Sequence, residues 1–364
     1  MPIFPLGYGG FAWFQYRSWW GKRALVNLVE ATSKKMDRTI VFDSYWRFAA
    51  ERLAVYLRRL ADPSGPWTDD LILRSYRFTN SYRVADRVSQ YLVREVQYRA
   101  DRSQAPAELF FRTLLFKLFN RIETWELIER ELGPVSWQAT ELDAVMTVLD
   151  GALRRHATIY SAAYIMPSPN LGGARKHENH LKLLAAMMDE GVPARVERSA
   201  NLSEVYGLLK PWPGLGDFLA FQYAIDLNYS AMLDFDEGSF VVAGPGALDG
   251  IAKCFSSTGG RDATSVIHMM VDEQESHFAR LGLDFPGLFG RRLQPIDCQN
   301  LFCEISKYSR VAHPEVNGSS GRTRIKQGYS GEGALSQPVF PARWNLQVPD
   351  FSAVAYAPRQ GALL

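Results

Sequence analysis

The sequence predicts a mainly α-helical protein that contains a helix-hairpin-helix turn and ends in an irregular C-terminal tail. Apolar residues recur at helical spacing in several long segments, of which 110–132 is the clearest amphipathic example. Alternating apolar and polar residues, the pattern of half-buried strands, are scarce. Helical segments end at glycine or proline, as 110–132 does at Gly133-Pro134. The 364 residues can bury a sizeable core, in one large or two medium domains.

The first half of the chain combines an irregular start with predicted helices. Residues 1–40 are aromatic and then basic, without helical periodicity. A helical pattern begins at Tyr45 and stops at Pro63. A threonine or an aspartate at 68–69 can cap the next helix, which we expect to run without a break through 71–96.

The second half continues the helical pattern and then loses it. From Glu315 onward the chain is rich in Gly, Ser, Gln and Pro, a composition typical of an extended tail packed on the body or of partial disorder. We therefore expect an irregular segment at 1–40, a helical body at 41–328 and a tail at 329–364. Further helical patterns occur at 138–166, 177–191, 266–283 and 293–314.

The charge of the chain is nearly balanced but unevenly placed. A net charge of +2 creates no global field for a polyanion. Between Val41 and Ile122, however, there are 14 Arg and Lys against 9 Asp and Glu, and 13 of the 14 are Arg. Arginine suits bidentate contacts with phosphates and carboxylates. Solvated helix faces are the alternative explanation of the same run.

Cysteine usage and hydropathy indicate the compartment. The spacings of Cys254, Cys298 and Cys303 match no zinc or disulfide framework, which favours a reducing environment. The apolar start is short, broken by Pro and Gly, and has no basic residue before it, unlike a signal peptide. No other apolar run reaches the ~18 residues that a membrane span needs. We expect an intracellular protein, cytoplasmic or nuclear, without a membrane partner.

The segment 209–226 contains the most informative turn of the chain. It reads as a helix end, a tight Pro-Gly-Leu-Gly turn and a second helix. Gly214 and Gly216 allow positive φ and close backbone approach, and they flank Leu215. The amides at the start of the second helix can hold one DNA phosphate without reading a base. The alternative is an ordinary interhelical turn whose glycines serve packing.

Carboxylates follow this turn at informative spacings. In helix-hairpin-helix glycosylases a catalytic aspartate lies roughly twenty residues after the last hairpin glycine, which corresponds here to Asp236, next to Glu237. Asp226 lies closer, near the end of the otherwise apolar second helix. Each could act as a general base or a metal ligand near a nucleotide. A solvated acidic loop is the alternative for the cluster at 234–237.

Two further segments could bind phosphate. The turn with Gly244 and Gly246 precedes a helix that contains Lys253, but it lacks the Gly-Lys-Ser/Thr of a Walker motif, and an ordinary loop is the alternative. On the predicted helix 71–96, several polar residues fall near one face and could hold a phosphate or a base edge, or form only exposed pairs. These residues are Arg77, Asn80, Arg83, Asp86 and Arg87. Because no carboxylate or cysteine completes a set with His177 and His180, no metal site is assigned.

Several segments occur together in an order that resembles a known family. This is the helical family named for 5-hydroxymethyluracil DNA kinases and the related α-glutamyl/putrescinyl thymine pyrophosphorylases of DNA-hypermodifying phages. The likeness covers roughly 40–328, and the tail matches nothing. The segments are WTDD at 67–70, YRFTNSYRVADR at 76–87, FFRTLLFKLFNR at 110–121, PWPGLGDFLAFQYAIDLNYS at 211–230, AGPGALDGIAKCF at 243–255, FCEISKY at 302–308 and GRTRIK at 321–326.

The resemblance implies a helix-hairpin-helix DNA glycosylase-like fold and a nucleotide-dependent transferase, part of thymine hypermodification. A flipped 5-hydroxymethyluracil in DNA would receive a phosphoryl group from ATP with Mg²⁺, so the partners would be DNA with a modified pyrimidine and a nucleoside triphosphate. The implied catalytic residues are Asp226, Asp236, Glu237, Arg83 and Asp86. The implied nucleotide- or phosphate-binding residues are Arg77, Asn80, Arg87, Gly244, Gly246 and Lys253. The implied DNA-binding residues are Gly214, Leu215, Gly216, Arg322, Arg324 and Lys326.

Two alternatives remain beside the kinase-like transferase. A DNA glycosylase acting on a modified or damaged base would also use a hairpin followed by an aspartate. A non-catalytic DNA-binding protein would keep the hairpin without the chemistry. Because the sequence contains no P-loop, a kinase activity rests on the family resemblance alone.

Overall fold

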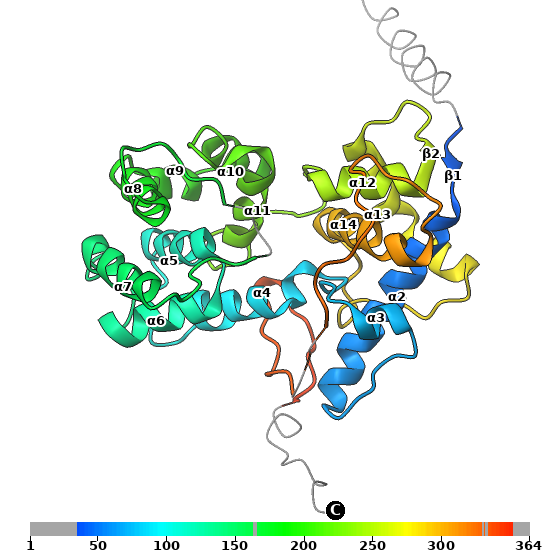
Figure 1. Cartoon of the computed structure of the whole chain (residues 1–364), viewed down its shortest axis with the longest axis horizontal. Coiled ribbons are helices and arrows are strands. Elements are labelled where there is room, and N and C mark those ends of the chain that lie inside the picture. The colour runs from blue at the N-terminus through cyan, green and yellow to red at the C-terminus, as the bar shows by residue number, and fades with distance from the viewer. Residues whose placement is uncertain (1–34, 163–165, 330, 332–333, 352–364) are drawn as a thin grey trace, which may run out of the picture.

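The computed structural model describes residues 35–162, 166–329, 331 and 334–351. Within these residues the chain is mainly helical, as predicted, and its strands are the short antiparallel pair β1 (Asp37–Arg38) and β2 (Phe255–Ser257). The helices form two lobes (Figure 1). Most of the predicted irregular segment 1–40 and the last part of the predicted tail lie outside the described residues.

The first lobe combines helices from both ends of the chain around one hydrophobic core. Thr39 caps its first long helix, because the Thr39 side chain accepts a hydrogen bond from the amide of Val41. Gln294 and Asp297 cap its last helix reciprocally. The helices of this lobe are α2 (Ile40–Ala61), α3 (Leu71–Ser75), α12 (Pro245–Cys254), α13 (Ala263–Arg280) and α14 (Pro295–Ala312).

The second lobe is a bundle formed by the middle of the chain around a second hydrophobic core. Figure 1 shows it beside the first lobe, with α4 between the two. Its helices are α5 (Pro106–Phe119), α6 (Ile122–Leu132), α7 (Leu142–Arg154), α8 (Lys176–Asp189), α9 (Val192–Glu197), α10 (Leu202–Leu209) and α11 (Gly216–Asn228).

Helix α11 belongs to both cores. Leu219 and Tyr223 pack in the core of the second lobe, whereas Phe221 and Ile225 pack in that of the first. The helix is therefore buried on all sides, which explains why its sequence is apolar around its whole circumference. A charged residue on α11 must find its partners inside the protein.

The predicted continuous helix 71–96 is wrong. The chain forms α3, an extended stretch, the 3₁₀ turn η1 (Arg83–Ala85), α4 (Arg87–Tyr91) and the π-helical turn η2 (Leu92–Gln97). The helix is interrupted because side-chain carboxylates accept hydrogen bonds from backbone amides that would otherwise donate within the helix. The amides of Thr79, Asn80 and Arg83 donate to Glu304, Asp86 and Asp297 at 3.0, 2.6 and 3.0 Å.

The described part of the C-terminal tail packs on the body. Val339 exchanges two hydrogen bonds with the side chain of Gln90 on α4, at 2.9 and 3.0 Å. The 3₁₀ turn η3 (Ala342–Trp344) follows, and the ring of Trp344 meets that of Tyr229 edge to face. The tail therefore joins α4 to the end of α11.

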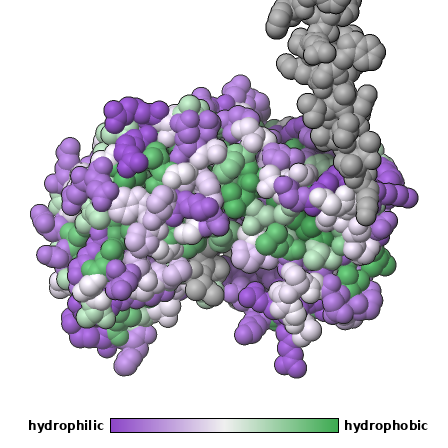
Figure 2. Space-filling view, turned by 90° about the horizontal axis from the view of Figure 1, so that it is seen from above, coloured by the Kyte–Doolittle hydropathy of each residue, from purple (hydrophilic) through white to green (hydrophobic). Residues whose placement is uncertain are grey.

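The surface of the molecule is mixed. Figure 2, a view from above, shows hydrophilic residues over most of the face, with smaller hydrophobic areas between them. None of the helices in the described part of the chain has the length and apolar content that crossing a membrane would require.

Candidate active site between the two lobes

Asp226 on α11 lies at the seam between the lobes and is completely buried. The guanidinium of Arg83 donates to both of its carboxylate oxygens, at 2.6 and 2.8 Å. This is the planar, bidentate geometry that arginine offers and lysine does not. The break in the predicted helix 71–96 brings Arg83 here, because η1 enters the seam instead of continuing along a helix surface.

Lys117 from α5 completes this ion cluster. Its ammonium lies 3.1 Å from the second oxygen of Asp226 and 2.7 Å from the side-chain oxygen of Asn120. The side-chain oxygen of Gln222 accepts from the Arg83 guanidinium at 2.7 Å. Both carboxylate oxygens of Asp226 are thus held by cations inside the protein.

The ionisation of this cluster follows from its burial. Burial raises the pKa of Asp226, but the positive charges of Arg83 and Lys117 outweigh it and lower the pKa below the usual value. Burial lowers the pKa of Lys117. Asp226 therefore remains a carboxylate that organises the seam, and its low basicity makes it a poor general base near neutral pH.

A second carboxylate, Glu237, lies in the loop that follows α11. Only 4% of its surface is exposed. Its oxygens face Arg291 from the first lobe at 3.1 Å and Arg343 from the tail at 3.6 Å, and the Asn228 amide donates to it at 3.4 Å. Burial raises the pKa of Glu237, although the two arginines act in the opposite direction.

Two more carboxylates, one buried and one partly buried, flank the seam. Asp297 on α14 accepts backbone hydrogen bonds from Arg83 and Gln294, each at 3.0 Å. Asp86 accepts from the Asn80 amide at 2.6 Å. Burial raises the pKa of each to about 7, so a fraction of each carboxyl is protonated near neutral pH.

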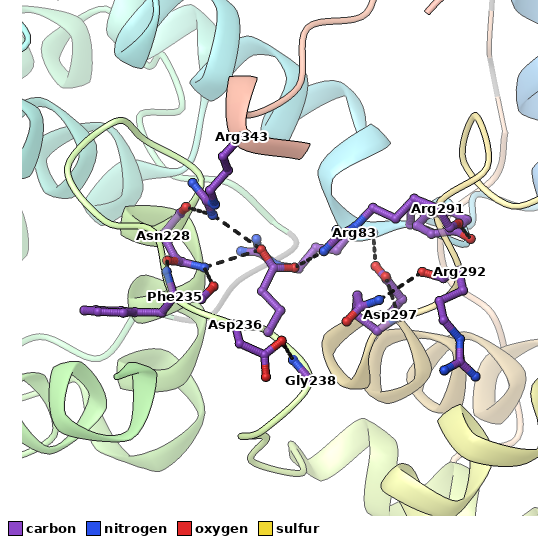
Figure 3. Close-up of polar contacts among 12 residues, drawn as sticks. Arg83, Asn228, Phe235, Asp236, Gly238, Arg291, Arg292, Asp297 and Arg343 are labelled. Atoms are coloured by element: carbon purple, nitrogen blue, oxygen red, sulfur yellow. Dashed lines mark hydrogen bonds and ion pairs between the residues drawn. The ribbon is translucent and has the colours of Figure 1, made fainter. Parts of the chain in front are cut away.

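The structure separates the other predicted catalytic and phosphate residues from this cluster. Asp236 is exposed, and its carboxylate accepts from the Gly238 amide at 3.0 Å (Figure 3). Arg77 and Arg87 are exposed, while Asn80 is buried. The predicted single helical face of Arg77, Asn80, Arg83, Asp86 and Arg87 therefore does not exist, because the helix that would carry it is broken.

The glycine-rich turn before α12 is filled by side chains. A Cβ on Gly244 would lie 2.5 Å from the ring of Phe218, and one on Gly246 would lie 3.0 Å from the sulfur of Cys303. Lys253 is buried, and its ammonium donates to the carbonyl of Ser306 at 2.9 Å. In the described structure, the small residues thus allow close packing, and Lys253 fixes α12 to α14.

The predicted hairpin lies between α10 and α11 with the expected backbone. Gly214 and Gly216 have φ of +85° and +51°, and Leu215 is buried. A Cβ on Gly216 would meet nothing within 4 Å, so a backbone approach there is open. Asp217, in the first turn of α11, pairs with Lys210 at 2.6 Å. This acidic side chain sits at the helix end where a phosphate would be expected.

Sequence reasoning missed Lys117, Arg291 and Arg343 as partners of the seam carboxylates. Lys117 lies in an amphipathic helix within the arginine-rich part of the sequence, and no pattern there distinguishes it from the neighbouring basic residues. Arg343 lies in the tail, where periodicity is absent. The described residues contain no group of three or more His, Cys, Asp or Glu side chains that could hold a metal ion.

The fold and the site define a two-lobed helical protein with a hairpin turn and a buried, charged seam. The chain belongs to the family described as 5-hmdU DNA kinase, helical domain, whose model matches residues 39–318. This confirms the family that the sequence motifs indicated.

A named relative is similar over most of the chain. The "5-hmdU DNA kinase" of Bacillus phage SP10 is 25% identical over 288 residues, which cover 74% of this chain and 45% of the relative. The chain thus spans about half the length of this curated relative. No solved structure matches.

Proposed function

We propose that this protein is a DNA-modifying transferase of the kinase type that acts on the hydroxymethyl group of 5-hydroxymethyluracil in DNA, as a step of thymine hypermodification. The observation that carries the proposal is the family match over residues 39–318, together with the name of the phage relative. The phosphoryl donor would be a nucleoside triphosphate such as ATP, with Mg²⁺. The base would leave the duplex to reach the seam.

Glu237 is the carboxylate that we assign to the hydroxymethyl group. It lies 21 residues after Gly216, in the loop where a helix-hairpin-helix glycosylase carries its acidic residue. Its raised pKa makes it a better proton acceptor near neutral pH than Asp226. Both of its oxygens face arginines in this conformation, so accepting a proton requires one of these ion pairs to open when DNA binds.

The described residues do not fit a preformed site for the nucleotide or for Mg²⁺. The glycine turn at Gly244 and Gly246 is packed against side chains, and Lys253 is buried. The oxygens of Asp226 and Glu237 are already engaged by cations. We therefore assign no step of the reaction to a nucleotide-binding or metal-binding residue.

This mismatch favours a second candidate function. Because the sequence contains no P-loop and the turn at Gly244 and Gly246 is packed against side chains, the second candidate is a protein that binds DNA and presents the modified base, with the nucleotide bound outside the described residues. In that case the hairpin and seam would act in recognition, and the phosphoryl donor would be held elsewhere.

Incubation with labelled nucleotide separates these functions. The full chain is mixed with γ-labelled ATP, Mg²⁺ and a duplex that carries one 5-hydroxymethyluracil, and a thymine duplex serves as control. We expect label in the modified duplex alone. Glu237→Gln should reduce the rate by ~100-fold or more, the scale of general-base loss, while Asp236→Asn stays near wild type.

The remaining outcomes point elsewhere. Binding of the modified duplex without label supports the presenting protein, and release of a free base supports a glycosylase. Absence of DNA binding contradicts all three functions. Equal rate losses in Glu237→Gln and Asp236→Asn would remove Glu237 from its assigned role.

A further inference from the structure

The structure joins two distant basic segments on the surface of the first lobe. The amide of Arg77 donates to the carbonyl of Gln327 at 3.0 Å, and the amide of Tyr329 donates to the carbonyl of Ser75 at 2.9 Å. Tyr76 and Gly328 form an antiparallel bridge. The end of α3 and residues 327–329 therefore lie side by side, and the basic residues at 322–326 immediately precede this contact in the sequence.

The basic segment is also fixed to α14 and α12, so its position is set by the fold. Arg310 on α14 donates to the carbonyl of Arg324 at 3.1 Å, and the amide of Ser320 donates to the carboxylate of Asp249 on α12 at 2.6 Å. A segment with few apolar residues of its own is thus held along the first lobe by backbone and side-chain hydrogen bonds.

The cations of this surface form a group that we name the basic strip. All of them are exposed, and no carboxylate of the described residues lies within the 4.0 Å ion-pair distance of any of them. Three other exposed arginines of the same lobe are paired, Arg38 with Glu273, Arg58 with Glu51 and Arg280 with Asp43. The basic strip consists of Arg74, Arg77, Arg322, Arg324 and Lys326.

Unpaired, exposed cations on a fixed backbone are suited to a polyanion. A carboxylate partner would neutralise these cations, and burial would impose a desolvation penalty on them. Phosphates along a nucleic acid backbone can meet several such cations in a row and release counterions.

We propose that the basic strip binds the phosphate backbone of DNA on the first lobe, as a contact separate from the hairpin of the second lobe. The proposal rests on the proposed function only in taking DNA as the partner. It reassigns Arg77 from the nucleotide to the DNA backbone, and it adds Arg74, which no sequence pattern indicated.

Salt-dependent binding of the full chain to duplex DNA tests this proposal. Each phosphate contact contributes about 0.9 to the slope of log affinity against log salt concentration. The variant with Arg322, Arg324 and Lys326 all changed to Ala should bind on the order of 10–100-fold more weakly at moderate salt. Its salt dependence should be less steep, with a slope smaller in magnitude by roughly 2–3. Arg77→Ala should reduce the magnitude of the slope by about 1.

A matched control removes the same charge from paired arginines. The variant with Arg38, Arg58 and Arg280 changed to Ala has the same net charge as the triple strip variant, and it should keep the wild-type slope. Equal slopes for the strip variant and the wild type would overturn the strip while leaving the proposed function intact. Equal losses in both triple variants would show a general charge effect and would also overturn it.

Two further outcomes separate the partners. If RNA of the same sequence binds the wild type more tightly and the strip variant loses only that binding, the strip is an RNA contact and our assignment is wrong. If the wild type binds no nucleic acid, the strip and the proposed function fail together. Label transfer without any effect of the strip variant would support the function and refute the strip.

Discussion

Replacing Arg83 with Lys tests whether the seam is held by a fixed, bidentate ion pair. In a buried environment the Arg83 guanidinium donates to both carboxylate oxygens of Asp226 and to the side-chain oxygen of Gln222. A lysine keeps the charge, but its single ammonium cannot occupy three positions of a planar fork. Lys117 still faces Asp226, so the carboxylate is not left without a cation.

The magnitude follows from the bonds that are lost. A hydrogen bond to a charged group contributes about 1.5–3 kcal/mol, and breaking a buried pair completely costs about 3–5 kcal/mol. Because the charge of Lys at position 83 is retained, we expect Arg83→Lys to destabilise the protein by about 2–4 kcal/mol. For a chain of 364 residues this corresponds to a fall in Tm of roughly 3–5 °C.

Thermal unfolding followed by circular dichroism measures this change. Arg280→Lys is the matched control, because Arg280 pairs with Asp43 on the surface and such pairs contribute about 0–1 kcal/mol. A Tm for Arg83→Lys within about 1 °C of the wild type would refute the buried bidentate pair. If that variant also lost transfer activity, Arg83 would belong to the reacting site and not to the framework.

Three further predictions test packing, ionisation and chemistry. Gly250→Ala places a Cβ 2.0 Å from the backbone oxygen of Phe302 and should lower Tm strongly, whereas Gly207→Ala meets nothing within 4 Å and should be neutral or slightly stabilising. The raised pKa of Asp86 stabilises the fold below pH 4, and this contribution is lost as pH rises to about 7, so Asp86→Asn should gain stability relative to wild type between pH 4.5 and 8 in urea unfolding. Unchanged relative stability across that range would contradict this. Glu237→Gln should keep DNA affinity in fluorescence anisotropy while losing transfer, and parallel losses of both would indicate a structural role.

The turn with positive φ at Gly214 and Gly216 could be predicted because it depends on local sequence. The apolar sequence around Asp226 was also visible, but its burial depends on the two lobes that pack around α11. The helix 71–96 could not be predicted correctly, because its residues have helical periodicity. The carboxylates of Glu304 and Asp297, more than 200 positions away in the sequence, accept hydrogen bonds from backbone amides that would otherwise have continued the helix.

The partners of the seam carboxylates depend on tertiary structure alone. Lys117 comes from α5, Arg291 from the loop before α14 and Arg343 from the tail. No spacing in the sequence relates these three residues to one another or to the carboxylates. The Arg343 guanidinium also donates to the carbonyls of Asn228 and Leu233, so the tail fixes the loop that carries Glu237. A composition rich in Gly, Ser and Pro gave no indication of this role.

The choice between Asp236 and Glu237 shows where spacing stops being informative. Counting from the hairpin indicates the loop, but the loop has no regular period that would decide which neighbour faces inward. The Asp236 carboxylate turns back to the amide of Gly238, a local hydrogen bond that an exposed aspartate commonly makes. Glu237, with a longer side chain, reaches Arg291 across the seam. A shift of one residue along the loop replaces an exposed carboxylate with a buried one. Only the tertiary structure, in which Arg291 of the first lobe faces Glu237, therefore distinguishes Asp236 from Glu237.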